Sequence, residues 1–246
     1  MTLKDLAKEL IRFSPVAITK NQEYDRQTKK VIKRVFDKDT IALDIGCHKG
    51  EILDLFLKFA PKGQYYAFEP IPDLFRLLKA KYLNLPNCHV FELALANDKG
   101  TADFNLVLDD MAFSGLKKRD YNKSFESQTI TVNTDRLDDV IPSNIDVDFI
   151  KIDVEGGEMQ VFYGSFETLK RCRPIVVFEH GLGASEYYGT KPEQVFDFLS
   201  SCGLKTSTMK RWLKGGPELT RYEFITQYNR RLNYYFIAYP DSVKSI

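Results

Sequence analysis

The segment Asp148–Glu158 constrains the fold of this 246-residue chain more than any other stretch of the sequence. Its first half, 149–152, contains apolar and β-branched residues interrupted only by Lys151, which predicts a short buried strand. Its second half is a glycine turn crowded with acids, including Asp153 and Glu155. Because burial of several carboxylates is costly, these acids are expected at a strand end that faces solvent. Ligands of open α/β sheets bind at the carboxyl ends of the strands, so we predict an active-site edge here.

Strands and helices alternate along most of the remaining sequence. This alternation predicts an α/β fold with a mostly parallel sheet and helices on both of its faces. Alternate residues of a strand share a face, so Lys151 and Asp153 should point the same way. The expected strands are 40–45, 64–68, 89–93, 149–152, 174–178, 204–209 and 232–239. The expected helices are 51–60, 72–82, a short one to residue 163 that continues to about 172 after a break at Gly164, and one between Thr190 and Gly203.

We expect residues 1–39 to form helices that pack on the core or cover it as a lid, and residues 40–246 to form a single domain. That domain contains an inserted hairpin and loop at about 100–134. The polar loop 109–124 either carries a substrate-specific feature or is a plain surface hairpin. The elements expected within these parts are helices 2–13 and 22–36 and strands 101–106 and 128–133.

The composition is that of an ordinary soluble globular protein, with 43% hydrophobic and 28% charged residues. The 35 basic and 34 acidic side chains give a net charge of +1, so a nucleic-acid partner is not favoured. The four cysteines lack metal-ligand spacing and indicate free thiols in a reducing compartment. Neither a signal-peptide pattern nor an apolar run of membrane-spanning length is found, so we expect a cytoplasmic protein without a membrane span.

Residues 44–50 lead from an expected strand into an expected helix, which is the context of a cofactor loop. Gly46 and Gly50 allow a tight turn, and the small Cys47 lies between them. The dinucleotide fingerprint G-x-G-x-x-G is absent, and Asp44 at the strand end would repel a pyrophosphate. A carboxylate here suits a ligand's ammonium group, and the amides of the helix start suit its carboxylate. S-adenosylmethionine carries both groups.

The next expected strand ends in Glu69 and Pro70. An acid in this position can accept hydrogen bonds from both hydroxyls of a ribose, which strengthens the prediction of S-adenosylmethionine. The alternative is that Asp44 and Glu69 are merely charged strand termini. Ala94 and Asn97, which follow the third strand, are also expected to contact the cofactor.

Several motifs resemble the FkbM family of S-adenosylmethionine-dependent methyltransferases, in the family's order and over about residues 40–180. The resemblance implies a Rossmann-like class I methyltransferase fold with a seven-stranded sheet, and O-methylation, often of sugar or natural-product hydroxyls. Cys47 departs from the small residue, such as Ala, that is usual there, and residues beyond 185 match only loosely. The motifs are Asp44–Gly50, Phe68–Pro70, Leu137–Asp139, Phe149–Glu158, whose Lys-Ile-Asp-Val-Glu-Gly core is the most specific, and Val177–Glu179.

A sugar hydroxyl is a poor nucleophile at neutral pH and benefits from a nearby base. Asp153 is our first candidate, as a base or as an acceptor that orients the hydroxyl, and it is also expected beside the cofactor. Glu155 is the second candidate, and His180, which follows the strand 174–178, is the third. Lys151 completes the candidate catalytic group, although a structural role beside a buried acid is favoured for it.

Asp153, Glu155, Glu179 and His180 could instead gather around a divalent cation such as Mg²⁺ or Mn²⁺, with Asp153, Glu179 and His180 as the first candidates. A metal ion would lower the pKa of the acceptor hydroxyl and remove the need for a base. This alternative is not favoured.

The leading hypothesis is an O-methyltransferase that acts on a hydroxyl of a small molecule, sugar or glycan. One alternative is RNA 2′-O-methylation, since Lys151, Asp153 and Glu179 form a Lys/Asp/Glu set, but a groove for RNA needs clustered basic residues. Another alternative is a module that binds S-adenosylmethionine without turnover.

Overall fold

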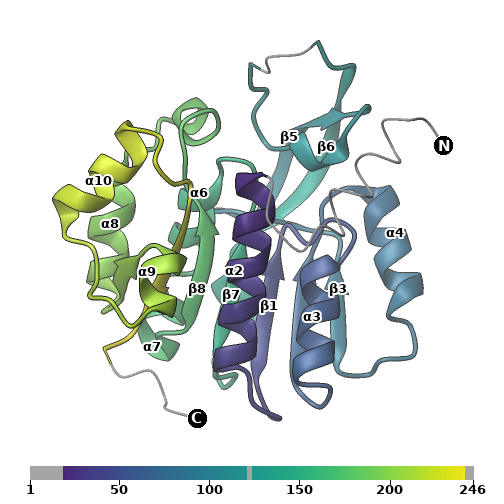
Figure 1. Ribbon diagram of the computed structural model, residues 1–246. Coiled ribbons are helices and arrows are strands. Elements are labelled where there is room, and N and C mark those ends of the chain that lie inside the picture. Colours follow the sequence, from purple (N-terminus) through teal and green to yellow (C-terminus); the bar gives the residue numbers. More distant parts are fainter. Residues whose placement is uncertain (1–18, 121–123, 242–246) are drawn as a thin grey trace.

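A computed structural model describes residues 19–120 and 124–241 of the chain, and its centre is a seven-stranded sheet (Figure 1). The strand order is β3-β2-β1-β7-β8-β10-β9. The pairs among the first five strands are parallel, and β10 runs antiparallel to both of its neighbours. The strands are β1 (Ile41–Ile45), β2 (Gln64–Phe68), β3 (Cys88–Phe91), β7 (Phe149–Ile152), β8 (Ile175–Glu179), β9 (Lys205–Ser207) and β10 (Tyr235–Tyr239).

Helices cover both faces of this sheet. Ala42 and Phe149 point to a face packed against buried side chains of α2 (Lys20–Val35), α3 (Glu51–Phe59), α4 (Pro72–Lys81) and α9 (Met209–Leu213). Leu43 and Ile150, one residue further along the same strands, point to the opposite face. That face packs against α5 (Leu137–Val140), α6 (Glu158–Tyr163), α7 (Phe166–Cys172), α8 (Pro192–Ser201) and α10 (Arg221–Asn229).

A second, three-stranded sheet extends above the main one (Figure 1) and has the order β4-β6-β5. β5 (Gly100–Val107) and β6 (Ser127–Asp135) form the antiparallel hairpin expected within 100–134, and β4 (Ala94–Leu95) pairs with β6. The loop between the two long strands contains the short 3₁₀ helix η1 (Met111–Phe113), and a second one, η2 (Ser185–Tyr188), follows β8.

α2 is fixed to the C-terminal part of the chain. A capping box at Thr19 and Gln22 starts the helix. The Tyr24 hydroxyl donates to the side chain of Asn233 over 3.2 Å, and the backbone N–H of Tyr234 donates to the Tyr24 hydroxyl over 3.3 Å. These contacts make α2 a fixed wall beside the carboxyl ends of the strands.

The segment 204–239 differs from the prediction of two strands separated by a polar stretch. The strands are shorter than expected, and α9 and α10 occupy most of the stretch between them. Both helices start at threonines, Thr208 and Thr220, whose side chains accept hydrogen bonds from backbone amides of the first turn. The expected helix 2–13 lies outside the described residues. Within the part of the chain that the structure covers, none of the helices combines the length and the apolar composition needed to cross a bilayer.

Candidate active site

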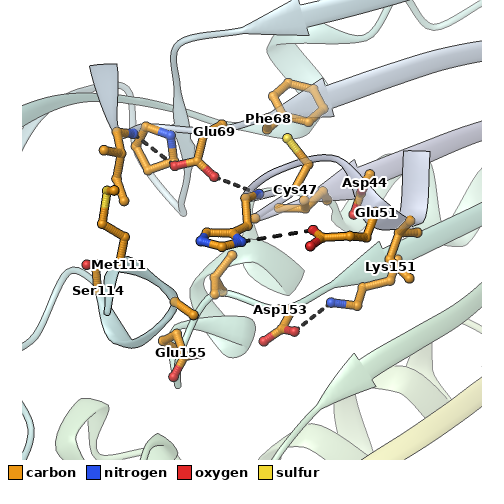
Figure 2. A pocket seen from close by; sticks show the side chains of 18 of the residues that line it. Asp44, Cys47, Glu51, Phe68, Glu69, Met111, Ser114, Lys151, Asp153 and Glu155 are labelled. Atoms are coloured by element: carbon orange, nitrogen blue, oxygen red, sulfur yellow. Dashed lines mark hydrogen bonds and ion pairs between the residues drawn. The ribbon is translucent and has the colours of Figure 1, made fainter. Parts of the chain in front are cut away.

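A cavity of about 840 Å³ opens at the carboxyl ends of β1, β2 and β7 (Figure 2). Its walls come from these strand ends, from α2 and α3, and from the segment 104–116 of the hairpin insertion. Of the predicted site residues, Asp44, Gly46, Cys47, Glu69, Pro70, Ala94, Lys151, Asp153 and Glu155 line it.

Asp44 is the most unusual residue of this cavity. Only 1% of its surface is exposed, and within residues 19–120 and 124–241 neither carboxylate oxygen has a hydrogen-bond partner of normal geometry, although the backbone N–H of Leu53 lies close enough to lower its pKa slightly. Burial raises the pKa of Asp44 to about 7, although the neighbouring Lys151 ammonium opposes the shift. A buried carboxylate without partners is costly to the fold and marks a position that a cationic ligand group would stabilise.

The loop after β1 depends on Gly46. Its φ of 77° lies in the left-handed region, and a Cβ there would come within 1.9 Å of the carbonyl oxygen of Asp153. The amides of Gly46 and Cys47 both donate to the carbonyl of Phe68, so the loop lies against the end of β2. Gly50 caps α3 without lining the cavity, and the Tyr82 hydroxyl occupies the space where its Cβ would be.

Glu69 is held in place by two backbone amides. Its Oε2 accepts from the N–H of His48 over 2.8 Å, and its Oε1 accepts from the N–H of Ile71 over 3.0 Å (Figure 2). Burial raises the pKa of Glu69 to about 7. Each carboxylate oxygen retains a lone pair, so the fixed group can accept further hydrogen bonds from a ligand. Asn97, in contrast, is exposed, hydrogen-bonds to Asp98 and does not line the cavity.

Lys151 and Asp153 point the same way, and the Lys151 ammonium lies 2.6 Å from Oδ2 of Asp153. Tyr235 of β10 donates a second hydrogen bond to that oxygen. Burial opposes ionisation of Asp153, but Lys151 and these hydrogen bonds lower its pKa below the ordinary value. Burial likewise opposes the charge of Lys151, yet Asp153 and Asp44 raise its pKa. The two residues therefore form a buried ion pair.

Further acids crowd around Asp153. Burial and the Asp153 charge raise the pKa of Glu155 to about 8, although Arg119 lies against it. Burial raises the pKa of Glu158 to about 7, with its Oε1 accepting from the N–H groups of Val154 and Gly156. Burial, followed by the charge of Asp153, raises the pKa of Glu179 well above its usual range.

His180 is placed on the other face of the sheet, away from the cavity. It follows Glu179 directly, and successive residues of a strand point to opposite faces. Its ring stacks on Tyr228 and Phe224 of α10, with 1% of its surface exposed. Burial lowers the pKa of His180 to about 3. The prediction that His180 lies beside Asp153 and Glu179 in the active site is therefore wrong.

Three of the four candidate metal ligands come together. Carboxylate oxygens of Asp153, Glu155 and Glu179 lie within 4.8 Å of one another, whereas His180 is not part of this cluster. The Lys151 ammonium already neutralises Asp153 in this cluster. We therefore do not assign a metal ion to it.

Two features of the cavity could not be read from the local sequence. Arg119 and Tyr235 contact the predicted acids from positions 36 and 82 residues away. Strand pairing alone identifies Tyr235, because β10 places it opposite Glu179.

Residues 44–205 match the family model described as the methyltransferase FkbM domain. The chain belongs to the FkbM methyltransferase family. The matched region contains both cofactor-loop acids, the ion pair after β7 and the whole hairpin insertion, so the FkbM domain includes all of the cavity except the wall provided by α2 and Tyr235.

Two curated proteins are similar in sequence. The 2-O-methyltransferase NoeI of Sinorhizobium fredii is 31% identical over 160 residues, which cover 60% of this chain and 66% of NoeI. The hexuronic acid methyltransferase AglP of Haloferax volcanii is 25% identical over 174 residues, covering 71% of this chain and 67% of AglP. The chain thus spans about two thirds of the length of these relatives.

A solved structure, the methyltransferase FkbM of Methylobacillus flagellatus, resembles the chain with a TM-score of 0.53 at 13% identity. The match covers 83% of this chain and 44% of that one. The predicted class I methyltransferase fold, with a mostly parallel seven-stranded sheet between helices, is confirmed.

Proposed function

We propose that this FkbM methyltransferase transfers a methyl group from S-adenosylmethionine to a hydroxyl of a sugar, glycan or natural product. The observation that carries the proposal is the buried, unpartnered carboxylate of Asp44 beside the fixed carboxylate of Glu69, across the cavity from Asp153 and Glu155. Asp44 and Glu69 suit the cofactor, and Asp153 and Glu155 suit the acceptor hydroxyl.

The residues at the ends of β1 and β2 fit S-adenosylmethionine. Asp44 lacks a partner that an ammonium group would supply, and Glu69 can receive the two ribose hydroxyls. Gly46 keeps the cradle open, since a side chain there would collide with the backbone of Asp153. When bound, the cofactor supplies an electrophilic methyl group on a sulfonium.

The residues after β7 fit the acceptor. Asp153 is held by Lys151 and Tyr235, so its remaining lone pairs are fixed in direction and can orient a hydroxyl. Glu155 lines the same cavity and can receive the proton of that hydroxyl. Holding the acceptor oxygen close and aligned supplies a large part of the acceleration in a transfer of this kind.

A sugar acceptor is supported by the two relatives, whose names state a 2-O-methyltransferase and a methyltransferase of hexuronic acid. The cavity itself is more acidic than basic, which does not favour an RNA backbone. Its charged lining residues are the acids Asp25, Asp44, Glu51, Asp54, Glu69, Asp153 and Glu155 and the bases Arg26, Lys29 and Lys151.

The proposal is tested with S-adenosylmethionine labelled in its methyl group and a panel of mono- and oligosaccharides that includes hexuronic acids. We expect label in a sugar methyl ether, and a loss of turnover of about 100-fold in Asp153→Asn, because the acceptor hydroxyl would be misplaced. Asp103→Asn, an exposed acid on β5, is the matched control and should keep full activity. Tight binding of S-adenosylhomocysteine without label in any acceptor would instead favour a module without turnover.

A further inference from the structure

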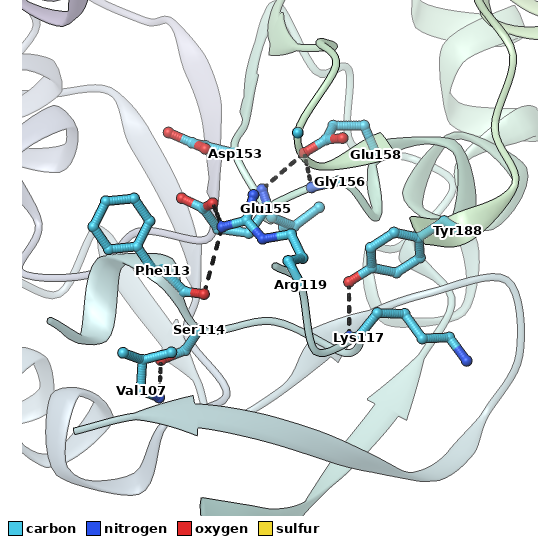
Figure 3. Close-up of polar contacts among 12 residues, drawn as sticks. Val107, Phe113, Ser114, Lys117, Arg119, Asp153, Glu155, Gly156, Glu158 and Tyr188 are labelled. Carbon is cyan, nitrogen blue, oxygen red and sulfur yellow. Dashed lines mark hydrogen bonds and ion pairs between the residues drawn. The ribbon is translucent and has the colours of Figure 1, made fainter. Parts of the chain in front are cut away.

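Arg119 belongs to the hairpin insertion, yet it reaches the acids of the active site. Only 7% of its side chain is exposed, and its guanidinium pairs with Oε2 of Glu155 (Figure 3). The same guanidinium donates to the carbonyl of Phe113 over 3.5 Å. An arginine buried this deeply in a loop is uncommon unless it is paired, and its partner here is a cavity-lining carboxylate.

The loop that carries Arg119 is fixed at both sides. On one side, Oγ of Ser114 accepts from the N–H of Val107 over 2.9 Å, which ties the loop to the end of β5. On the other side, the N–H of Lys117 donates to the hydroxyl of Tyr188 over 3.1 Å (Figure 3). These hydrogen bonds hold the part of the loop that places Arg119 against Glu155.

Glu155 needs such a support because its backbone is in an unfavourable conformation. Its φ of 58° lies in the left-handed region, which non-glycine residues seldom adopt. The next residue, Gly156, has a φ of 103°, and a Cβ there would lie 2.5 Å from the carbonyl oxygen of Ala184. Strain of this kind persists where the surroundings hold it and is concentrated at functional sites.

The two acids of the acceptor side are not equivalent. Oδ2 of Asp153 already accepts from both Lys151 and Tyr235, and a carboxylate that is stabilised in this way is a weak base. Among the residues that the structure describes, the cationic partner of Glu155 is Arg119, which contacts one of its oxygens, and Glu155 lines the cavity. The more basic of the two acids is therefore Glu155.

We propose that Glu155 is the proton acceptor of the reaction and that Arg119 is the positioning residue that holds it toward the acceptor hydroxyl. This inference rests on the proposed function. As the acceptor oxygen forms its bond to the methyl carbon, the carbon–sulfur bond breaks and its electron pair stays on sulfur. The hydroxyl proton passes to Glu155, which later releases it to solvent, while Asp153 keeps the acceptor oriented.

The basicity of Glu155 depends on several neighbours. Arg119 lowers its pKa, whereas burial and the nearby acids raise it, so loss of the guanidinium should raise the pKa further. A base must be ionised to work, so the rising limb of the activity against pH should move to higher pH in Arg119→Met. The groups that face Glu155 are Asp153 at the end of β7, Glu158 of α6, Glu179 of β8, Tyr188 of η2, Tyr235 of β10 and Arg119 of the insertion.

The test compares Arg119→Met, Arg119→Lys and the control Lys118→Met, which removes an exposed charge from the same loop. At pH 7.5 we expect Arg119→Met to lower kcat about 10-fold or more, with the KM for S-adenosylmethionine little changed, Arg119→Lys to restore part of the loss, and the control to match the wild type. In the Glu155→Gln background, Arg119→Met should lower kcat by less than about threefold, because the two residues act as a unit.

A titration of the Glu155 side-chain carboxyl by carbon-13 NMR, with S-adenosylhomocysteine bound, provides a readout that needs no turnover. We expect a higher pKa in Arg119→Met than in the wild type. An unchanged Glu155 titration, or equal losses of kcat in both backgrounds without a shift of the pH limb, would overturn the role of Arg119. If no sugar is methylated by the wild type, the proposed function fails, while the titration still tests the coupling of the two side chains.

Discussion

Replacing Asp44 by Asn should raise the stability of the ligand-free protein and weaken the binding of the cofactor. Burial raises the pKa of Asp44 from its ordinary 3.8 to about 7. Once the carboxyl group is ionised in both states, a pKa raised this far lowers the free energy of unfolding, and so the stability, by up to about 4 kcal/mol. We therefore infer that this acid is kept for a ligand and not for the fold.

The raised pKa of Asp44 makes the wild-type protein less stable at high pH than at low pH. The folded state holds its proton up to a pH of about 7 and the unfolded state only up to 3.8, so stability is lost as the pH rises through this interval. Asn keeps the shape and removes the charge, but its amide still lacks hydrogen-bond partners. Because the protonated carboxyl of the wild type lacks such partners as well, we expect the ligand-free Asp44→Asn protein to be up to about 4 kcal/mol more stable than the wild type at pH 8, and about equal to it near pH 4.

Binding should respond in the opposite direction. The ammonium group of S-adenosylhomocysteine would lose a charge-assisted hydrogen bond worth about 1.5 to 3 kcal/mol, so its Kd should rise roughly 10- to 100-fold. Urea unfolding at pH 8 and pH 4 measures the first effect, and titration calorimetry at pH 8 measures the second. A variant that is less stable than the wild type at pH 8, or that binds the ligand as tightly, would refute this explanation of Asp44.

Three further outcomes are expected. Glu69→Gln should weaken S-adenosylhomocysteine binding about 10-fold by calorimetry, because a neutral amide accepts ribose hydroxyls less well; an unchanged Kd would remove Glu69 from the site. Gly46→Ala should lose ligand binding and several degrees of Tm, since its Cβ would lie 1.9 Å from a carbonyl oxygen, whereas Gly189→Ala, with a φ of 69° and nothing within 4 Å, should only lower Tm slightly. Chelation by EDTA should leave kcat unchanged, because Lys151 already neutralises Asp153; restoration of lost activity by Mg²⁺ would show that the acid cluster holds a metal ion.

Much of the main sheet could be predicted because β1, β2, β3, β7 and β8 are short, largely apolar runs that end at a glycine or an acid. The strand β2 (Gln64–Phe68) and the helix after it were placed to within a residue. The two helices at 209–213 and 221–229 were missed because the first has only five residues and five of the nine residues of the second are polar. Thr220 and Glu223, which form a capping box, were the available signal for the second of them.

The candidate site was predictable where it depends on the strand ends and not where distant segments meet there. Asp44, Glu69 and Asp153 each follow from the position of one strand. The alternation that placed Lys151 and Asp153 together also separates Glu179 from His180, so the sequence contained the information that contradicts a shared site. Arg119 could not be found in this way, because only the folded insertion brings it to Glu155.

A crystal structure with S-adenosylhomocysteine and a sugar acceptor is the most direct test of the central claim. Our account predicts the ligand's ammonium within hydrogen-bond distance of Asp44, its ribose hydroxyls on Glu69, and its sulfur facing an acceptor hydroxyl held by Asp153 and Glu155. A ligand bound elsewhere, or an acceptor hydroxyl remote from both of these acids, would contradict it.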